Sequence, residues 1–284
     1  MTQDLNEIIK DVTIYFRLTG LCNSKCDFCY RDSAGIIGEN LKSVKKIIDK
    51  IKSFGFKKIG FLGGEIFLRS DIEEIFIYAK KKGLKIYLPS NGSLLQGKNL
   101  KIVEKYVSWL GLPLDGSDRE KSLKTRDTFD QFKITINLLK YFKKKPPKFK
   151  VKISTLVSRI NKGDIYNIGK LIFQSKNLYA PTAWRILKFL PMEKGKETRK
   201  KYFISEREFL LATKKSVDNF GKKFNVSFGN FVYLIISANA RILKSKGNKY
   251  IDCGNFKKIT KKNFFNLMKD GTLLKVAENN AWKY

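Results

Sequence analysis

Three of the protein's cysteines lie close together in the stretch GLCNSKCDFCYRD, residues 20–32. The chain has four cysteines in 284 residues, and Cys22, Cys26 and Cys29 follow the spacing Cys-x3-Cys-x2-Cys. Thiolates are soft ligands that select zinc, copper or iron–sulfur clusters, and a structural zinc ion nearly always takes four protein ligands. Only Cys253 could complete such a zinc site. Three thiolates on a cuboidal 4Fe-4S cluster would instead leave one iron open to a small molecule.

Histidine is absent from the chain. Its absence excludes a Ser-His or Cys-His nucleophile pair, a His-liganded zinc and an imidazole proton shuttle. Any metal must therefore be held by sulfur or oxygen.

The chain is strongly basic, with 58 Lys and Arg against 26 Asp and Glu and a net charge of +32. Such a charge can indicate a polyanionic partner such as RNA, DNA or a nucleotide. It is equally typical of a lysine-rich protein whose lysines only solvate the surface. Because the basic residues are scattered in pairs and triplets and form no recognised nucleic-acid-binding module, the second interpretation is favoured.

No membrane segment is predicted. The first eleven residues lack a basic region followed by an apolar stretch, and no run of about 18 apolar residues occurs elsewhere. We therefore expect a cytoplasmic protein with no membrane partner. Disulfides are uncommon in that compartment, which directs clustered cysteines toward metal binding or catalysis.

Hydrophobic periodicity alternates between strand and helix along the first two thirds of the chain. Strands are predicted over residues 12–18, 58–63, 84–89, 107–114, 149–157 and 183–190. Helices are predicted over residues 41–55, 70–83, 97–106, 128–143 and 164–174, the second opened by a capping box of Ser70 and Glu73. This alternation predicts an α/β fold with a parallel sheet, a partial (β/α)6 TIM-type barrel.

The remaining residues predict a small α+β C-terminal extension. Residues 203–220 form an amphipathic pattern with Ser205 as a possible helix cap, and residues 231–243 predict two strands about a turn at 237–239. We therefore divide the chain into a core barrel, residues 1–192, and an extension over the substrate side, residues 193–284.

Unusual loops follow five of the six predicted strands. They are the cysteine loop, Gly63-Gly64-Glu65, Ser90-Asn91-Gly92, the stretch with Asp115 and Arg126, and residues 155–161. The carboxyl ends of barrel strands meet at one mouth, so these loops are expected to face a common cavity.

Two of these loops carry a family resemblance. The cysteine motif, with Phe28 before its last cysteine, and the Gly-Gly-Glu after the next strand resemble the radical S-adenosylmethionine (SAM) superfamily, over roughly residues 10–192. The resemblance implies a 4Fe-4S cluster on Cys22, Cys26 and Cys29, with SAM on its open iron. One electron would cleave SAM, and a 5′-deoxyadenosyl radical would abstract a substrate hydrogen. It also implies an electron donor such as ferredoxin or flavodoxin, while no catalytic side chain is assigned.

The resemblance further implies which residues bind SAM. The amine would be bound by Gly63, Gly64 and Glu65, and the carboxylate by Arg126. The ribose and adenine would lie against Ser90, Asn91, Ser154 or the strand residues 155–157. Pro113 stands where relatives often carry a ribose-binding serine. This departure from the family pattern concerns the residues assigned to the ribose.

The substrate is left open by the sequence. The order of motifs is also similar to viperin-like members of the family, which act on nucleoside triphosphates, and this likeness implies Lys152 and Arg185 as phosphate-binding residues. A peptide, RNA or another small molecule is the alternative. Cys253 is expected to be a buried structural cysteine rather than a hydrogen donor. From a different class, the four cysteines could form a structural zinc site in a nucleic-acid-binding module.

Overall fold

The computed structural model describes residues 9–32, 34–126, 129–221, 226–229 and 234–268. Within them a ten-stranded sheet has the order β10-β9-β8-β1-β2-β3-β4-β5-β6-β7. The strands are β1 (Thr13–Arg17), β2 (Lys58–Leu62), β3 (Lys85–Pro89), β4 (Trp109–Pro113), β5 (Lys150–Val157), β6 (Ala183–Lys188), β7 (Val226–Gly229), β8 (Leu234–Ile236), β9 (Arg241–Lys246) and β10 (Lys249–Asn255).

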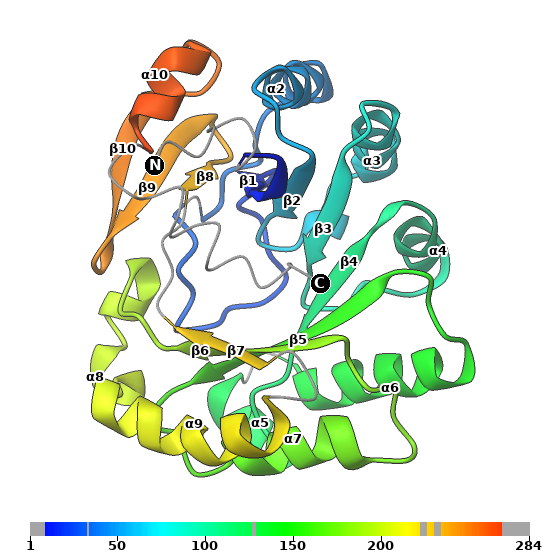
Figure 1. The fold of residues 1–284 in the computed structure, drawn as a ribbon, viewed down its shortest axis with the longest axis vertical. Helices are drawn as coiled ribbons and strands as arrows, with labels where there is room; N and C mark the ends of the chain where they lie inside the picture. The colour runs from blue at the N-terminus through cyan, green and yellow to red at the C-terminus, as the bar shows by residue number, and fades with distance from the viewer. Residues whose placement is uncertain (1–8, 33, 127–128, 222–225, 230–233, 269–284) are drawn as a thin grey trace.

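Helices cover the outer face of this curved sheet (Figure 1). They are α2 (Leu41–Ser53), α3 (Ile72–Lys81), α4 (Gly97–Tyr106), α5 (Arg119–Thr125), α6 (Gln131–Lys144), α7 (Ile165–Gln174), α8 (Arg199–Tyr202), α9 (Glu206–Phe220) and α10 (Lys261–Asn266), with 3-10 turns η1 (Ile66–Leu68) and η2 (Glu193–Lys196). Strands β1 to β7 pair in parallel. The predicted α/β class and partial (β/α)6 barrel are therefore confirmed.

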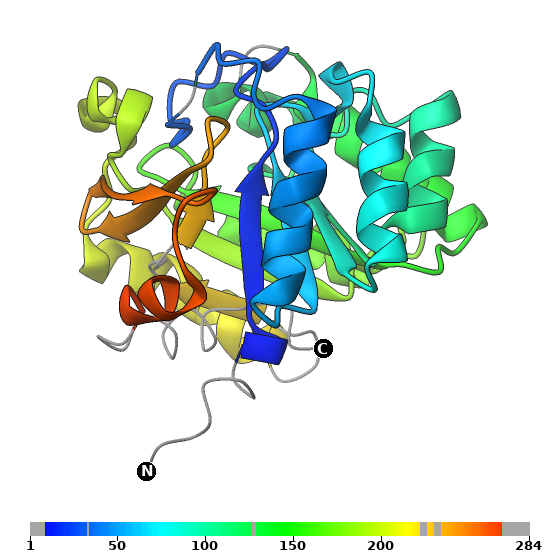
Figure 2. The same cartoon turned by 90° about the horizontal axis from the view of Figure 1, so that it is seen from above.

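The first helix after β1 shows how local sequence builds these units. α2 begins after Asn40, whose side chain accepts a hydrogen bond from the Ser43 N–H at 3.0 Å. Its apolar side chains at three- and four-residue spacing are buried, and the chain leaves the helix at Gly55 with φ +105°. α2, α3 and α4 lie side by side outside the sheet (Figure 2). In the described part of the chain no helix is long and apolar enough to cross a membrane.

Alternation along the strands separates the two faces of the sheet. In β5, Val151 and Ile153 belong to the main core beneath the helices, whereas Ser154 lines a cavity on the inner face. Deeper on the inner face, Tyr87, Trp109 and Ala183 form a separate apolar cluster. The helices thus pack on one side of the sheet, and the other side is left for the site.

The C-terminal residues extend the sheet at both edges. β7 pairs with β6, while β8 pairs in parallel with β1 and continues through antiparallel β9 and β10. The strands predicted about the 237–239 turn are confirmed as β8 and β9, although residues 231–233 of that prediction lie outside the described residues. The predicted cap of α9 is also confirmed, because Ser205 and Glu208 form a reciprocal capping box.

Other local predictions were wrong or incomplete. Ser70 and Glu73 form no capping box; α3 begins at Ile72 after Asp71, with no side-chain cap. Asp71 instead accepts two hydrogen bonds from Arg69, at 2.9 and 2.7 Å, so its carboxylate is not available to the helix end. Strands β7 and β10 and the short helices α5, α8 and α10 were not predicted.

Candidate functional site

A cavity of about 210 Å³ lies at the carboxyl ends of the barrel strands. Its walls come from the loop after β1, the turn after β2 and the ends of β5 and β6. Seven of the residues expected to hold the cluster or SAM line it: Cys22, Cys26, Cys29, Gly63, Gly64, Arg126 and Ser154. The structure therefore brings the three clustered cysteines together with four of the residues expected to bind SAM.

The cysteine loop holds its sulfurs beside hydrogen-bond donors. All three cysteines are free thiols and partly exposed. The Ser24 N–H donates to Cys22 Sγ at 3.4 Å, and Ser24 Oγ lies 3.0 Å from Cys26 Sγ. Burial raises the pKa of the Cys22 thiol, against the opposing effects of the Ser24 hydrogen bond and the Arg31 charge. These contacts suit sulfurs that become thiolates when they bind metal.

The donor set fits a cluster better than a single ion. No three of the Cys, Asp or Glu side chains among the described residues gather closely enough to hold one metal ion. A zinc ion would need its sulfurs about 2.3 Å away on all sides. A 4Fe-4S cluster binds each thiolate at a different iron, so its ligands stand further apart. The three thiols that line the cavity are the type and number of donor that the second arrangement needs.

Residues after β6 hold the cysteine loop in place. Thr198 Oγ1 donates to the Asp27 carbonyl at 3.0 Å, and the Asp27 carboxylate pairs with Lys194 and Lys201 at 3.3 and 3.4 Å. Lys194 also donates to the Lys25 carbonyl at 3.2 Å. The loop is therefore supported from the C-terminal half of the chain as well as from β1.

The Gly63-Gly64 turn brings the second loop against the first. The Gly64 N–H donates to the Thr19 carbonyl at 2.9 Å, and the Glu65 N–H donates to the Leu21 carbonyl at 2.8 Å. A Cβ at Gly64 would lie 2.1 Å from the Leu21 carbonyl oxygen and 2.5 Å from Cys22 Cβ. Only glycine permits this approach, so the turn shapes the cavity floor beside Cys22.

We expect Gly64→Ala to destabilise the fold by about 1–3 kcal/mol and to lower the iron bound after reconstitution, because the added methyl displaces the Cys22 backbone. Urea unfolding and iron analysis would measure the two effects. Gly163→Ala is the matched control, since a Cβ there meets nothing within 4 Å. Equal losses in both variants would contradict the close-approach explanation.

Glu65 lies beside the cavity without lining it. Its side chain is 1% exposed, and its carboxylate accepts hydrogen bonds from Ser90 Oγ at 2.9 Å, the Asn91 N–H at 3.0 Å and the Phe67 N–H at 3.3 Å. Burial raises its pKa, although these hydrogen bonds oppose the rise. In this structure Glu65 joins the Gly-Gly-Glu turn to the loop after β3, and its contact with a SAM amine stays a prediction.

The Ser90-Asn91 loop continues this network toward the cysteines. Asn91 Nδ2 donates to Asn23 Oδ1 at 2.9 Å, and Asn23 Nδ2 donates to Ser93 Oγ at 2.9 Å. Neither Ser90 nor Asn91 lines the cavity. Their expected role at the ribose or adenine stays a prediction, while Ser154 does reach the cavity wall.

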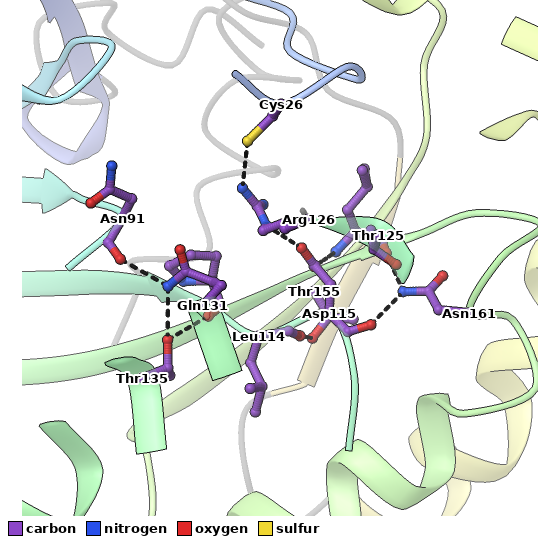
Figure 3. A network of polar contacts seen from close by, with 12 residues as sticks. Cys26, Asn91, Leu114, Asp115, Thr125, Arg126, Gln131, Thr135, Thr155 and Asn161 are labelled. Carbon is purple, nitrogen blue, oxygen red and sulfur yellow. Dashed lines mark hydrogen bonds and ion pairs between the residues drawn. The ribbon is translucent and has the colours of Figure 1, made fainter. Parts of the chain in front are cut away.

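Arg126 contacts both the cysteine loop and a buried carboxylate (Figure 3). Its Nε pairs with Asp115, its Nη1 donates to Cys26 Sγ at 3.5 Å, and its guanidinium lies 4.7 Å from the centre of the Phe28 ring. Burial alone would lower the pKa of Arg126, but the charges of Asp115 and Cys26 outweigh burial and raise it. Arg126 therefore stays a cation at the cavity wall.

Lys152 and Arg185, which the likeness to viperin-like members implies as phosphate-binding residues, lie inside the barrel, and their role stays a prediction. Both are buried, 8% and 4% exposed, so neither is a surface residue. Each is the third residue of its strand, and neither lines the cavity. Arg185 is in register with Ser154, and Lys152 lies two residues before Ser154 on the same face of β5. The two cations thus lie in the barrel interior, one layer below the cavity.

Cys253 is separate from the cysteine loop. It lies in β10, is packed against the main core and does not line the cavity. The four-thiolate zinc site that the sequence left open therefore lacks its fourth ligand.

The cavity wall formed by the end of β6 was not predicted from the sequence. Leu187, Lys188 and Phe189 line it, and their position at the carboxyl end of a barrel strand was the available signal. The ion pair of Arg17 with Asp32, which joins β1 to the residues just after Cys29, was not predicted either. The inward polar alternation Thr13, Tyr15, Arg17 could have indicated it.

Comparison with known proteins agrees with this geometry. The family model described as "Radical SAM superfamily" matches residues 16–172. An "S-adenosylmethionine-dependent nucleotide dehydratase" of Lacinutrix mariniflava is 27% identical over 230 residues, which cover 76% of this chain and 47% of that protein. A protein of the same name from Flammeovirga pacifica is 24% identical over 266 residues, 80% of this chain and 86% of the relative. The chain thus spans about half the length of the first relative and most of the second.

Among solved structures, "Native anSMEcpe with bound AdoMet and Kp18Cys peptide" superposes with a TM-score of 0.70 at 19% sequence identity. The match covers 89% of this chain and 80% of that one. At this identity the likeness shows a shared fold.

Proposed function

The chain belongs to the radical SAM superfamily, and on that ground we propose that it cleaves SAM reductively and uses the resulting radical to take a hydrogen atom from its substrate. The observation that carries this proposal is the cavity lined by three thiols, a close-packed glycine turn and Arg126. When bound, a 4Fe-4S cluster supplies the electron for SAM cleavage, delivered to it by a carrier such as ferredoxin or flavodoxin.

Different residues of the protein would bind the cluster and SAM. Cys22, Cys26 and Cys29 would ligate three irons. The backbone at Gly63 and Gly64, which line the cavity, would take the amine of SAM, and Arg126 its carboxylate. The apolar residues Leu156, Leu187 and Phe189 also line the cavity and would limit the entry of water, which would protect a reactive radical from side reactions.

Anaerobic purification and reconstitution test this function directly. The protein should be brown, bleach with dithionite, and release 5′-deoxyadenosine when SAM and dithionite are added. A colourless protein with one zinc per chain would overturn the proposal.

We further propose a phosphorylated nucleotide as the substrate. Lys152 and Arg185 place two basic side chains in the barrel interior, and burial, followed by the neighbouring Arg185 charge, holds the pKa of Lys152 well below its ordinary value. An anion beside them would offset both effects and keep Lys152 charged. Phosphate groups suit such a pair, because Arg binds through its planar fork and Lys as a point charge. The relatives named as nucleotide dehydratases support this choice.

We expect one of the nucleoside triphosphates to raise 5′-deoxyadenosine formation at least about tenfold over a substrate-free control. The double variant Lys152→Ala with Arg185→Ala should lose this stimulation and keep the basal SAM cleavage. Lys140→Ala, an exposed lysine on α6, is the matched control and should behave as wild type. If no nucleotide raises the rate, the substrate proposal falls, and peptides, RNA and other small molecules become the candidates.

A further inference from the structure

The guanidinium of Arg126 is held against the middle cysteine of the motif from several sides. Its Nη1 donates to Cys26 Sγ at 3.5 Å, and its guanidinium carbon lies over the Phe28 ring. Its own backbone is fixed as well, because the Arg126 N–H donates to the Ser122 carbonyl at 2.8 Å where α5 ends. The side chain is 18% exposed. A charge fixed this close to one sulfur acts on that sulfur whether or not another ligand is present.

Asp115 fixes the direction of this arginine. It is fully buried and pairs with Arg126 Nε through Oδ2, while its Oδ1 accepts a hydrogen bond from the Leu156 N–H at 2.7 Å. Asn161 Nδ2 donates to the carbonyl oxygens of both Asp115 and Leu156, at 2.9 and 2.7 Å. Figure 3 shows the resulting chain from Asn161 through Asp115 and Arg126 to Cys26. The Asp115 carboxylate is thus held by a hydrogen bond to β5, and it directs the Arg126 guanidinium toward the sulfur.

We propose that Arg126, directed by Asp115, raises the reduction potential of the cluster through its hydrogen bond to Cys26 Sγ. This inference rests on the proposed function, since it needs a cluster on the three cysteines. One-electron reduction adds a negative charge to the cluster and its sulfurs. A cation and a hydrogen bond at a ligating sulfur stabilise the reduced form more than the oxidised form. The negative charge of Asp115 opposes this effect less strongly than Arg126 produces it, because Asp115 reaches Cys26 only through the guanidinium and so lies further from the sulfur.

This role can be separated from binding of the SAM carboxylate. A residue that only binds SAM changes SAM affinity and leaves the SAM-free cluster as it was. A residue that tunes the cluster changes its potential before SAM is added. The potential of the SAM-free cluster is therefore the deciding quantity, and it is independent of turnover.

The test is a redox titration of the reconstituted, SAM-free protein, followed by the electron paramagnetic resonance signal of the reduced cluster. Arg126→Gln should lower the ratio of reduced to oxidised cluster at a fixed potential about tenfold, which equals about 59 mV for one electron. Arg126→Lys keeps the positive charge, so its ratio of reduced to oxidised cluster should lie between those of wild type and Arg126→Gln. Arg159→Gln removes an exposed arginine that does not line the cavity and should titrate as wild type.

Asp115→Asn tests the directing role. A reduction potential shifted in the same direction as in Arg126→Gln means that the guanidinium is no longer held toward Cys26 Sγ, as proposed. A shift to more positive potential means that Asp115 acts through its own charge, which overturns its part.

The remaining outcomes are also decisive. Equal potentials in wild type and Arg126→Gln, with weaker SAM binding in the variant, would assign Arg126 to SAM alone and overturn the inference. If Arg126→Gln assembles no cluster, Arg126→Lys carries the same comparison. A wild-type protein that assembles no 4Fe-4S cluster would instead overturn the proposed function itself.

Discussion

Alanine at any one of Cys22, Cys26 or Cys29 should abolish the 4Fe-4S cluster and, with it, all SAM cleavage. Each sulfur would ligate a different iron, and the structure offers no replacement thiol at the cavity within the described residues. The expected loss is complete, because the remaining two thiolates cannot hold the cluster against solvent. Iron and sulfide per chain, measured after anaerobic reconstitution, give the result directly.

Cys253→Ala is the matched control for this series. Its sulfur lies in β10, away from the cavity wall, and should be replaceable with full retention of iron and sulfide. Loss of the cluster from this variant would mean that four thiolates share the metal and would return the zinc-type site to consideration.

Glu65→Ala should be the most damaging change outside the cysteines. The carboxylate is the common acceptor for Ser90 Oγ and two backbone N–H groups, and all three donors are left without it in a buried site. An unsatisfied buried donor costs about 1–3 kcal/mol, so we expect a loss of at least about 3 kcal/mol of unfolding free energy. SAM affinity should fall as well, because the turn that carries Gly63 and Gly64 loses its attachment to the loop after β3.

Denaturant unfolding and equilibrium SAM binding would measure both effects of Glu65→Ala. Glu74→Ala is the control: this residue lies on α3, is 61% exposed in its side chain, and pairs with Lys45 only at 3.8 Å. Its removal should change unfolding free energy by less than about 1 kcal/mol. If Glu65→Ala is as mild as Glu74→Ala, the buried network does not hold the two loops together.

The regular part of the fold was predictable because its periodicity is strong. The apolar residues of α2 can be buried together only on one face of a helix, and the alternating residues of β5 only on the faces of a strand. Both elements are present as predicted. β10 reads KYIDCGN and none of its residues is fully buried, so the sequence carries little apolar alternation from which to predict it. The Ser70 prediction failed for a different reason: a side-chain pair of Arg69 and Asp71, which no local capping rule describes, decides how α3 begins.

The candidate site was also predictable from the sequence only in part. The cysteine loop and the glycine turn were predictable as neighbours, because both follow adjacent parallel strands. The position of Glu65 was not, since its carboxylate turns toward Ser90 rather than into the cavity. The contacts of Arg126 with Asp115 and Cys26 were also not predictable, because they join three loops whose approach depends on the packing of β4 and β5.

The position of β1 has a consequence for how the protein is made. On one side β1 pairs with β2, about 45 residues later, and on the other with β8, about 220 residues later. At roughly 5–20 residues per second, ribosomes need tens of seconds to reach β8 after β1 has emerged. Throughout that time one edge of β1 is an open template for pairing with other chains, a hazard that chaperones limit. Iron inserted early would enter a loop whose strand is only half paired, so productive metal loading should follow translation of β8.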